Sequence, residues 1–318
     1  MTMTADGVRT ETALLRLGAA LKDAGYSFTT VTPATHERVN RRPANAWARD
    51  LRDVFGWSRP FRPGRLPDGI VELMDAAGVL DRAADGWRSR VRFSTYDGEL
   101  FVHSAFPTAA PDAVFLGPDT YRMADAAIAH VQAREQPIHR AVDIGCGTAA
   151  GAIAVAKRAP GAEVLAVDIN EAALRYARVN VALAGTPAVR PCRSDLLDAV
   201  DGTFDLIIAN PPFMVDPAGR TYRDGGGRHG HRLSLAIVDA ATRRLRPGGS
   251  LVLFSGTGIL TGHDPLRAAA ADRLHGTNLR WTYREVDPDV YSEELDGPAY
   301  AEAERIAVVV LTATHVPA

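Results

Sequence analysis

The sequence predicts an α/β protein whose larger part is a doubly wound, mostly parallel sheet, preceded by a mainly helical region with a β-hairpin. Three observations support this fold class. From about residue 119 onwards, apolar runs typical of buried strands alternate with segments of helical periodicity. Before residue 90, apolar residues recur at helical spacing. Between these regions, Asp97-Gly98 separates two β-rich runs, which is a strong hairpin signal.

Length and composition are those of an ordinary folded protein with more than one domain. The chain has 318 residues, 46% hydrophobic and 23% charged, so it can form a sizeable core and is not mainly disordered. No apolar run reaches about 18 residues, and no secretion signal is evident. With a net charge of −2 and two cysteines, we expect a reduced, cytoplasmic protein that neither crosses a membrane nor coats nucleic acid.

The first ninety residues contain two amphipathic helices by pattern. Leu14, Leu17 and Leu21 share one helical face, and Gly25 provides a stop. A second apolar set, ending near Gly78, has the same spacing: Ile70, Leu73, Met74, Ala77 and Leu80. Residues 91–104 form the predicted hairpin, and two prolines follow. We expect an accessory domain over residues 1–112 and the α/β domain over residues 113–318.

Residues 35–65 are unusually basic. They hold eight arginines and three acidic residues, an excess of five positive charges, together with four aromatic residues. Such a stretch suits an anionic partner, but it also suits a helical subdomain with a solvated arginine face. We favour the second interpretation because no recognised nucleic-acid motif accompanies the arginines.

The second part of the chain is expected to alternate helices and strands. Helices are predicted at residues 124–131, 150–158, 171–183 and 233–245. Strands are predicted at residues 140–144, 163–167, 204–209, 250–254, 279–286 and 305–312, with a turn at residues 247–249. Sheets of this kind bind ligands at the carboxyl ends of their strands, so residues directly after the strands are the candidates for a site.

The first candidate is the glycine-rich turn Gly145-Cys146-Gly147, which leaves a predicted strand and enters a predicted helix. Glycines let the backbone turn tightly and approach a ligand closely. The turn alone also satisfies a loose dinucleotide fingerprint. It therefore predicts a nucleotide-containing cofactor without naming it.

Nearby carboxylates favour S-adenosylmethionine over a dinucleotide. Asp143 precedes the first glycine by two residues; it can bind the ammonium of a methionine moiety, directly or through water, and would repel a pyrophosphate. Asp168 ends the next strand and can accept hydrogen bonds from both ribose hydroxyls, although capping the following helix is its alternative role. Asp195, after the third strand region, can accept from an adenine amino group or cap a helix.

The most specific segment is Asn210-Pro211-Pro212-Phe213, directly after the buried strand 204–209. A planar nitrogen is a poor nucleophile because its lone pair is delocalised, and two acceptors aimed at its N–H bonds can hold it in place. The side-chain oxygen of Asn210 and the carbonyl of Pro211 can supply them, and the prolines stiffen the turn. Phe213 can stack on a planar acceptor. The alternative is that the tetrapeptide is a purely structural turn. We favour a catalytic role because the glycine-rich turn with its preceding Asp143 lies upstream.

A Gly-rich loop follows this tetrapeptide. Tyr222, Arg223 and Asp224 lie in it and are candidates to cover a substrate. His229 and His231 are too few for a metal site, so we expect no metal. Cys146 is expected to serve packing, because no base partner for a nucleophile is evident.

Residues 142–147, residues 166–170 and the N-P-P-F tetrapeptide together resemble the class I S-adenosylmethionine-dependent methyltransferases. The likeness is to the small-domain group, which includes release-factor glutamine and rRNA guanine-N2 methyltransferases, and it covers roughly residues 113–314. It implies a Rossmann-like, seven-stranded domain and S-adenosylmethionine as cofactor. Relatives place a linker that helps close the cofactor site at residues 115–121. The turn departs from the family at Ala149, where relatives carry a third glycine, and is two residues longer.

We therefore expect N-methylation of a planar nitrogen. The amide of a protein glutamine is the first choice of acceptor, and an exocyclic amine of RNA or DNA, or a small-metabolite amine or amide, stays open. The rival classes are a dehydrogenase and a non-catalytic cofactor-binding regulator, and the intact Asn210 argues against the regulator.

Overall fold

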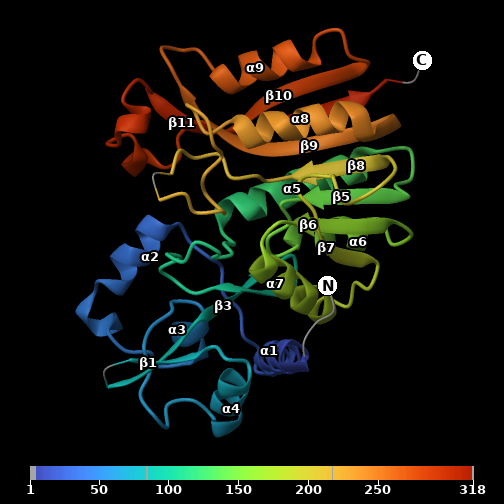
Figure 1. Ribbon diagram of the computed structural model, residues 1–318. Coiled ribbons are helices and arrows are strands. Elements are labelled where there is room, and N and C mark those ends of the chain that lie inside the picture. Colours follow the sequence, from blue (N-terminus) through green and yellow to red (C-terminus); the bar gives the residue numbers. More distant parts are fainter. Residues whose placement is uncertain (1–4, 84, 217, 317–318) are drawn as a thin grey trace.

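The computed structural model of the protein describes residues 5–83, 85–216 and 218–316 (Figure 1). Its larger part is a seven-stranded sheet with the order β10-β11-β9-β8-β5-β6-β7. Strand β11 is antiparallel to both of its neighbours, and the other paired strands are parallel. This confirms the predicted fold class. The strands are β5 (Arg140–Ile144), β6 (Glu163–Asp168), β7 (Val189–Arg193), β8 (Phe204–Ala209), β9 (Leu245–Ile259), β10 (Leu279–Asp287) and β11 (Arg305–His315).

Helices cover both faces of the sheet. One face carries α5 (Pro118–Ala133), α6 (Ala150–Arg158) and α7 (Glu171–Leu183), and the other carries α8 (Arg232–Arg244) and α9 (Pro265–Leu274). The alternation along β8 shows why both faces are apolar: Leu206 and Ile208 pack on the α5–α6 side, whereas Ile207 and Ala209 pack on the α8 side.

The amino-terminal region combines short helices with two hairpins. The two predicted amphipathic helices are confirmed as α1 and α4, and Asp97 and Gly98 form the turn of the β3–β4 hairpin with φ of 51° and 77°. A second hairpin, β1–β2, was not predicted, and Leu80 lies in it rather than on α4. The elements are α1 (Ala5–Asp23), α2 (Pro33–Asn40), η1 (Pro43–Asn45), α3 (Leu51–Phe55), α4 (Asp68–Ala76), β1 (Leu80–Ala83), β2 (Gly86–Ser89), β3 (Val91–Tyr96) and β4 (Glu99–Ser104).

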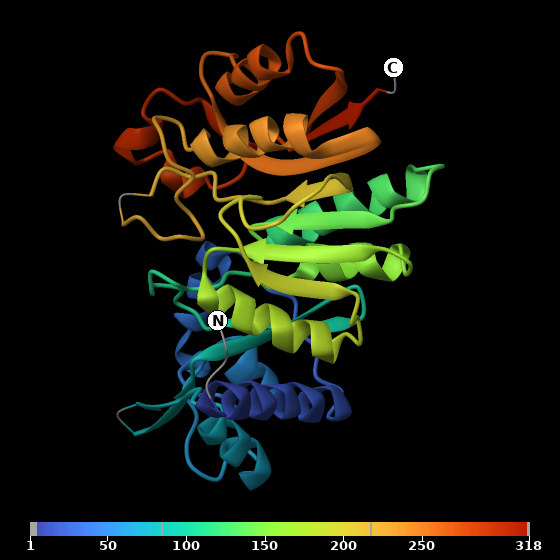
Figure 2. The same ribbon diagram turned by 45° about the vertical axis from the view of Figure 1, so that its right-hand side comes forward.

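Helix α7 joins this region to the sheet. It packs beside α1 (Figure 2), and its Ala173, Tyr176 and Val179 belong to the same apolar cluster as the cores of α1 and the β3–β4 hairpin. Asn180 of α7 is fully buried. It accepts a hydrogen bond from the Val102 N–H (2.7 Å) and donates to the Val102 carbonyl (3.1 Å) and the Thr148 carbonyl (3.0 Å). One side chain therefore ties the free edge of β4 to the glycine-rich turn.

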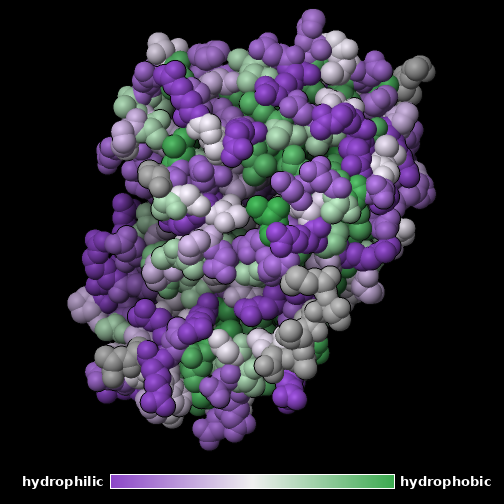
Figure 3. Space-filling view, in the orientation of Figure 1, coloured by the Kyte–Doolittle hydropathy of each residue, from purple (hydrophilic) through white to green (hydrophobic). Residues whose placement is uncertain are grey.

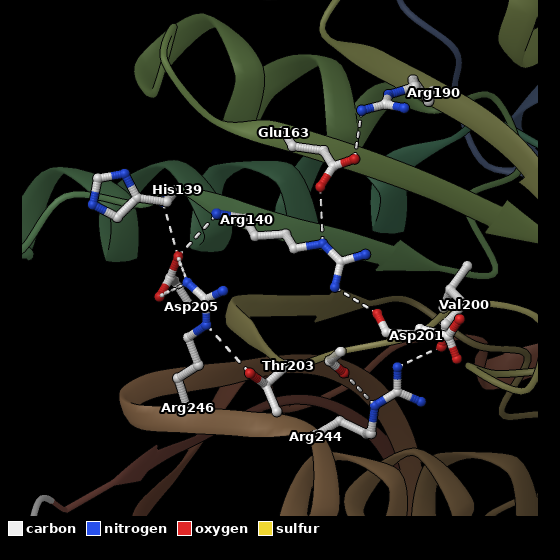
Figure 4. A network of polar contacts seen from close by, with 11 residues as sticks. His139, Arg140, Glu163, Arg190, Val200, Asp201, Thr203, Asp205, Arg244 and Arg246 are labelled. Atoms are coloured by element: carbon white, nitrogen blue, oxygen red, sulfur yellow. Dashed lines mark hydrogen bonds and ion pairs between the residues drawn. The ribbon is translucent and has the colours of Figure 1, made fainter.

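A polar network closes the amino ends of the central strands (Figure 4). Asp205 accepts from the backbone N–H groups of His139 and Arg140, both at 2.9 Å. Arg140 pairs in turn with Glu163 at 2.9 Å. Arg244 donates to three carbonyls of one loop, those of Leu197, Val200 and Gly202. The network holds the loop between β7 and β8 against the end of α8.

Other elements differ locally from expectation. Helix α9 was not predicted, because its alanine-rich sequence has weak amphipathic patterning. The expected turn at residues 247–249 lies within β9, where the pairing with β8 shifts register. Within the three described stretches of chain, no helix combines the length and the apolar character needed to cross a membrane.

Candidate functional site

The glycine-rich turn sits at the carboxyl end of β5 and lines a pocket. Gly145 and Gly147 have φ of 69° and 52°, in the left-handed region that glycine tolerates. The N–H groups of Gly145 and Cys146 both donate to the Val167 carbonyl, at 2.9 and 3.0 Å. A Cβ added at Gly145 would meet nothing within 4 Å. The turn is thus fixed to β6 on one side and presents bare backbone on the other.

Ala149 stands where relatives carry a third glycine, and the structure shows a glycine with a packing role two residues later, at Gly151. Ala149 adopts φ 60° and ψ 22° at the start of α6. Close contact between helix and sheet falls at Gly151 instead, where a Cβ would lie 2.8 Å from Met123 and 2.9 Å from the Asp143 carboxylate. Gly151 therefore takes the close-packing position that a third glycine has in shorter turns.

Asp168 reaches the pocket from the end of β6. Its Oδ2 accepts from the Gly147 N–H and its Oδ1 from the Asn170 N–H, both at 2.9 Å. Burial raises the pKa of its carboxyl above the ordinary value, although these backbone donors oppose the rise. Asn170, not Asp168, caps α7, because its side chain accepts from the Ala172 N–H at 2.9 Å. A carboxylate has further lone pairs, so Asp168 can still accept from a bound hydroxyl group.

Asp143 lies behind the glycine-rich turn and does not line the pocket. Its side chain is 1% exposed and accepts from the Ala152 N–H of α6 at 3.0 Å. Burial raises its pKa to about 7, with a smaller contribution from the charge of Asp168. Asp143 thus holds the start of α6 through the Ala152 N–H. It does not face the pocket, so its contribution to cofactor binding is to support the glycine-rich turn.

A third side of the pocket is lined by residues that directly follow β7. Asp195 is exposed and lines the pocket together with Ser194 and Leu196. Ser194 is buried, and its hydroxyl accepts from the Ala199 N–H at 3.0 Å, so Ser194 rather than Asp195 caps this turn. Ile169, directly after Asp168, is 49% exposed and also lines the pocket. Ile169 was not singled out from the sequence. The signal that could have found it is its position, directly after the carboxylate that ends β6.

The Asn210-Pro211-Pro212-Phe213 turn lies beside the glycine-rich turn. Ala209, which ends β8, pairs with Ile144, which ends β5, so Asn210 and Gly145 leave adjacent strands at one edge of the sheet. All four residues of the turn line the pocket. Phe213 is only 7% exposed and packs against Phe254, with ring centroids 6.5 Å apart. Most of its ring is therefore in the core, over Gly256, where a Cβ would lie 2.3 Å away.

The Gly-rich loop rests directly on this turn. The Met214 N–H donates to the Arg223 carbonyl (3.1 Å), and the Gly225 N–H donates to the Met214 carbonyl (2.9 Å). A Cβ at Gly230 would lie 2.2 Å from the Phe213 carbonyl oxygen, so only glycine permits this approach.

The three candidates of the Gly-rich loop differ in whether they line the pocket. Tyr222 and Arg223 line the pocket, and Asp224 does not. Tyr222 stacks on Phe115 and donates to the Thr108 carbonyl at 2.9 Å, which links the loop to the amino-terminal region. Asp224 instead accepts from backbone N–H groups of its own loop.

Comparisons with known proteins identify the family of the chain. A family model described as the methyltransferase small domain matches residues 124–260. A release factor glutamine methyltransferase from Mycobacterium leprae (strain TN) is 35% identical over 205 residues, which cover 57% of this chain and 69% of that protein. The chain belongs to the small-domain family of S-adenosylmethionine-dependent methyltransferases.

Two further proteins are similar to this methyltransferase. A 4-amino-L-phenylalanine/4-methylamino-L-phenylalanine methyltransferase from Streptomyces pristinaespiralis is 29% identical over 194 residues, 56% of this chain and 63% of that one. The crystal structure of M. jannaschii tRNA m1G37 methyltransferase superposes with a TM-score of 0.50 at 16% identity, over 74% of this chain and 60% of that one. At that identity the likeness shows the fold alone.

The pocket of the methyltransferase fits its cofactor, S-adenosylmethionine, which carries a sulfonium and an ammonium group. The carboxylates of Asp168 and Asp195 line it, whereas the lining Asp119 is engaged by Tyr291 and Arg122 and the lining Arg223 is paired with Glu294. This distribution favours a cationic ligand. The bare backbone of Gly145 and the exposed side chain of Ile169 offer room and apolar surface for a nucleoside.

A further lining residue of the methyltransferase, Tyr291, was not singled out from the sequence, and its partner Asp119 lies in the segment 115–121 that the resemblance placed beside the cofactor site. The hydroxyl of Tyr291, in the connection between β10 and β11, donates to the carboxylate of Asp119 in the first turn of α5. No local pattern marks Tyr291 as part of a site. The fold brings Tyr291 and Asp119 together across a separation of 172 residues.

His231 and Cys146 are buried, which is typical of residues with a packing role. His231 is buried beside His229, and burial lowers its pKa to about 4. Burial raises the pKa of the Cys146 thiol, which disfavours the reactive thiolate. Among the residues that the structure describes, no three His, Cys, Asp or Glu side chains are grouped as metal ligands.

Proposed function

We propose that the methyltransferase transfers a methyl group to a planar nitrogen, and that its acceptor is the side-chain amide of a protein glutamine. The observation that carries the proposal is the position of Asn210. It leaves β8 directly beside the glycine-rich turn of β5, and it shares a pocket with the Asp168 carboxylate. An amide acceptor and a rigid carbonyl therefore stand next to the cofactor-binding edge of the sheet.

The chain's own residues would hold and polarise the acceptor. The Asn210 side-chain oxygen and the Pro211 carbonyl accept the two N–H bonds of the nitrogen, which fixes its position and stabilises positive charge developing on it. Both prolines restrict φ, so the carbonyl needs little reorganisation. The cofactor supplies an electrophilic methyl group on sulfur. Asp168 and the glycine-rich turn position the nucleoside end.

A glutamine amide is supported by the relative from Mycobacterium leprae, which is named for methylating glutamine in a release factor. A small aromatic amine is the second candidate, because the Streptomyces relative is named for 4-amino-L-phenylalanine. Both acceptors present a nitrogen conjugated with a π system, so the same turn suits both.

A transfer assay with radiolabelled methyl groups separates the candidates. The purified enzyme is incubated with a purified bacterial release factor, with 4-amino-L-phenylalanine, and with total RNA. We expect label in the release factor and its recovery as N-methylglutamine after digestion. Label in the small amine alone would favour the second candidate, and label in RNA alone would overturn both.

Asn210→Ala should abolish turnover while the cofactor stays bound. Loss of one positioned acceptor should raise the barrier by about 2.7–4 kcal/mol, by analogy with deletion of one oxyanion-hole donor. The measurement is the single-turnover rate, with S-adenosylhomocysteine affinity determined separately. Asn210→Asp is the matched variant: it keeps an acceptor but places a full charge near the sulfonium. A wild-type rate in Asn210→Ala would rule out this mechanism.

The amino-terminal region is proposed to help select the acceptor. Pro33 and Thr108 line the pocket, and Thr108 holds Tyr222 of the covering loop. We propose that residues 1–112 act as an accessory domain to the catalytic part at residues 113–318.

A further inference from the structure

The connection between β10 and β11 (residues 288–304) lies against the loop that follows the N-P-P-F turn and contributes to the lining of the pocket. Glu294 pairs with Arg223, and Glu302 pairs with Arg228 at 3.1 Å. The hydroxyl of Tyr300 accepts from the Val215 N–H at 3.0 Å. The connection is therefore attached at several points to the loop that follows the N-P-P-F turn.

Tyr291 is the residue of this connection that lines the pocket. It has φ 55° and ψ 39°, a left-handed conformation that is uncommon for a bulky residue and is found more often at functional sites. Its ring contacts Phe213 with centroids 6.2 Å apart and planes tilted by 57°. The backbone conformation thus directs an aromatic side chain toward the turn proposed to hold the acceptor.

The partner of the Tyr291 hydroxyl determines what that hydroxyl can offer a substrate. It donates its proton to the buried carboxylate of Asp119, whose other oxygen lies 3.5 Å from Arg122. Arg122 is fixed in turn by Asp287 at 2.7 Å. A tyrosine hydroxyl has one proton and two acceptor lone pairs. With its proton committed to Asp119, Tyr291 can only accept hydrogen bonds from a bound molecule.

We propose that Tyr291 is a specificity-determining residue of the acceptor subsite, where its oxygen accepts a hydrogen bond from an N–H group of the acceptor, and that Asp119 is the positioning residue that sets this polarity. The inference rests on the proposed function and deepens it. It adds a third acceptor to Asn210 and Pro211 and selects molecules with a further N–H donor near the reacting nitrogen. A peptide-borne glutamine amide and a free amino acid both carry such a donor in their backbone nitrogen.

The test uses the full-length enzyme with Tyr291→Phe, Asp119→Asn and the double variant. The acceptor is the release factor, or whichever of 4-amino-L-phenylalanine and RNA the wild-type enzyme methylates. We expect each single variant to raise KM for the acceptor about tenfold, with kcat within about twofold and S-adenosylhomocysteine affinity unchanged. The double variant should be no worse than the single variants, because both disrupt one unit.

Tyr300→Phe is the matched control, since it removes a hydroxyl from the same connection at a residue that does not itself line the pocket. Its KM should equal that of the wild type. An unchanged KM in Tyr291→Phe, or an equal loss in Tyr300→Phe, would overturn the assignment of Tyr291. Additive effects in the double variant would overturn the role of Asp119. Absence of wild-type transfer to every acceptor would overturn the proposed function and this inference together, whereas transfer with an insensitive Tyr291→Phe overturns the inference alone.

Discussion

Single side chains at the pocket have two distinct kinds of task. Asp168 faces the pocket and is held by two backbone N–H groups, whereas Asp143 faces the core and holds a helix. Both are strand-end carboxylates on the same face of the sheet, but Asp143 is level with Ala166, two residues before Asp168, so Asp168 lies closer to the carboxyl edge where the pocket opens. Their substitutions should therefore have different effects.

Asp168→Ala should weaken binding of S-adenosylhomocysteine by about 1–3 kcal/mol, because the ribose hydroxyls lose a charged acceptor. Calorimetric titration measures the affinity. Asn170→Ala is the control: it removes the cap of α7 and should lower stability while affinity is largely retained. Equal affinity in Asp168→Ala and the wild type would show that Asp168 only shapes the turn.

Asp143→Asn should stabilise the cofactor-free protein more at pH 8 than at pH 5. The pKa of the folded carboxyl is raised from 3.8 to about 7, so the fold favours the protonated form. Wild-type stability therefore falls as pH rises from about 4 to 7, by up to about 1.4 kcal/mol per pH unit, and asparagine lacks this loss. Urea unfolding at both pH values measures the difference. The same gain at both would show that Asp143 does not titrate in this range.

At the scale of elements, one buried amide links parts that are distant in sequence. Asn180 satisfies both backbone groups of Val102 and the carbonyl of Thr148. Asn180→Ala should leave these groups without partners and destabilise the protein by about 1–3 kcal/mol for each that stays buried. Cofactor affinity should fall as well, since Thr148 directly follows the glycine-rich turn and lines the pocket.

Urea unfolding and calorimetry with S-adenosylhomocysteine test both effects of Asn180→Ala. Asn180→Asp is the matched variant, because it keeps an acceptor for the Val102 N–H but loses the donors to the two carbonyls. A variant as stable as the wild type would mean that water replaces the amide at no cost.

Elements with strong local patterning could be predicted from the sequence. The bounds of β5, α6, α7 and β8 match expectation because each combines an apolar face with a clear stop signal. Helix α9 lacks such a face. Asn210, Asp168 and the glycines could be singled out because they follow strands. Tyr291 could not, because its place in the pocket depends on the pairing of β10 and β11 and on the position of α5.

For the whole molecule, the basic stretch at residues 35–65 is largely engaged with the protein itself. Arg59 is buried with Asp53, Arg49 also pairs with Asp53, and Arg41 pairs with Glu37. Arg52 and Arg62 lie over aromatic rings. Figure 3 shows a mostly hydrophilic surface where α2 lies. Among the described residues, Arg38, Arg42 and Arg65 are exposed and make no ion pair or ring contact.

We therefore expect weak binding of RNA with a shallow salt dependence. The five arginines of the stretch without an ion pair would neutralise at most about five phosphates, which corresponds to a slope of log K against log salt no steeper than about −3.5 for a single strand. Fluorescence anisotropy with a labelled single-stranded RNA between 50 and 200 mM salt, roughly the range in which such contacts are lost, measures the slope. A slope near −6, abolished by Arg38→Glu with Arg42→Glu, would instead identify this face as a nucleic-acid interface.

The packing of α7 limits how the protein can be divided. A chain cut after residue 112 would uncover Ala173, Tyr176 and Val179, which now lie in the core shared with α1 and the β3–β4 hairpin. The Thr148 carbonyl would keep its amide partner, but that amide would face water and lose the strand edge that orients it. Exchange of residues 113–318 between proteins as an independent module would therefore require redesign of the outer face of α7, so a change in that face and a change in the amino-terminal region are coupled through one core.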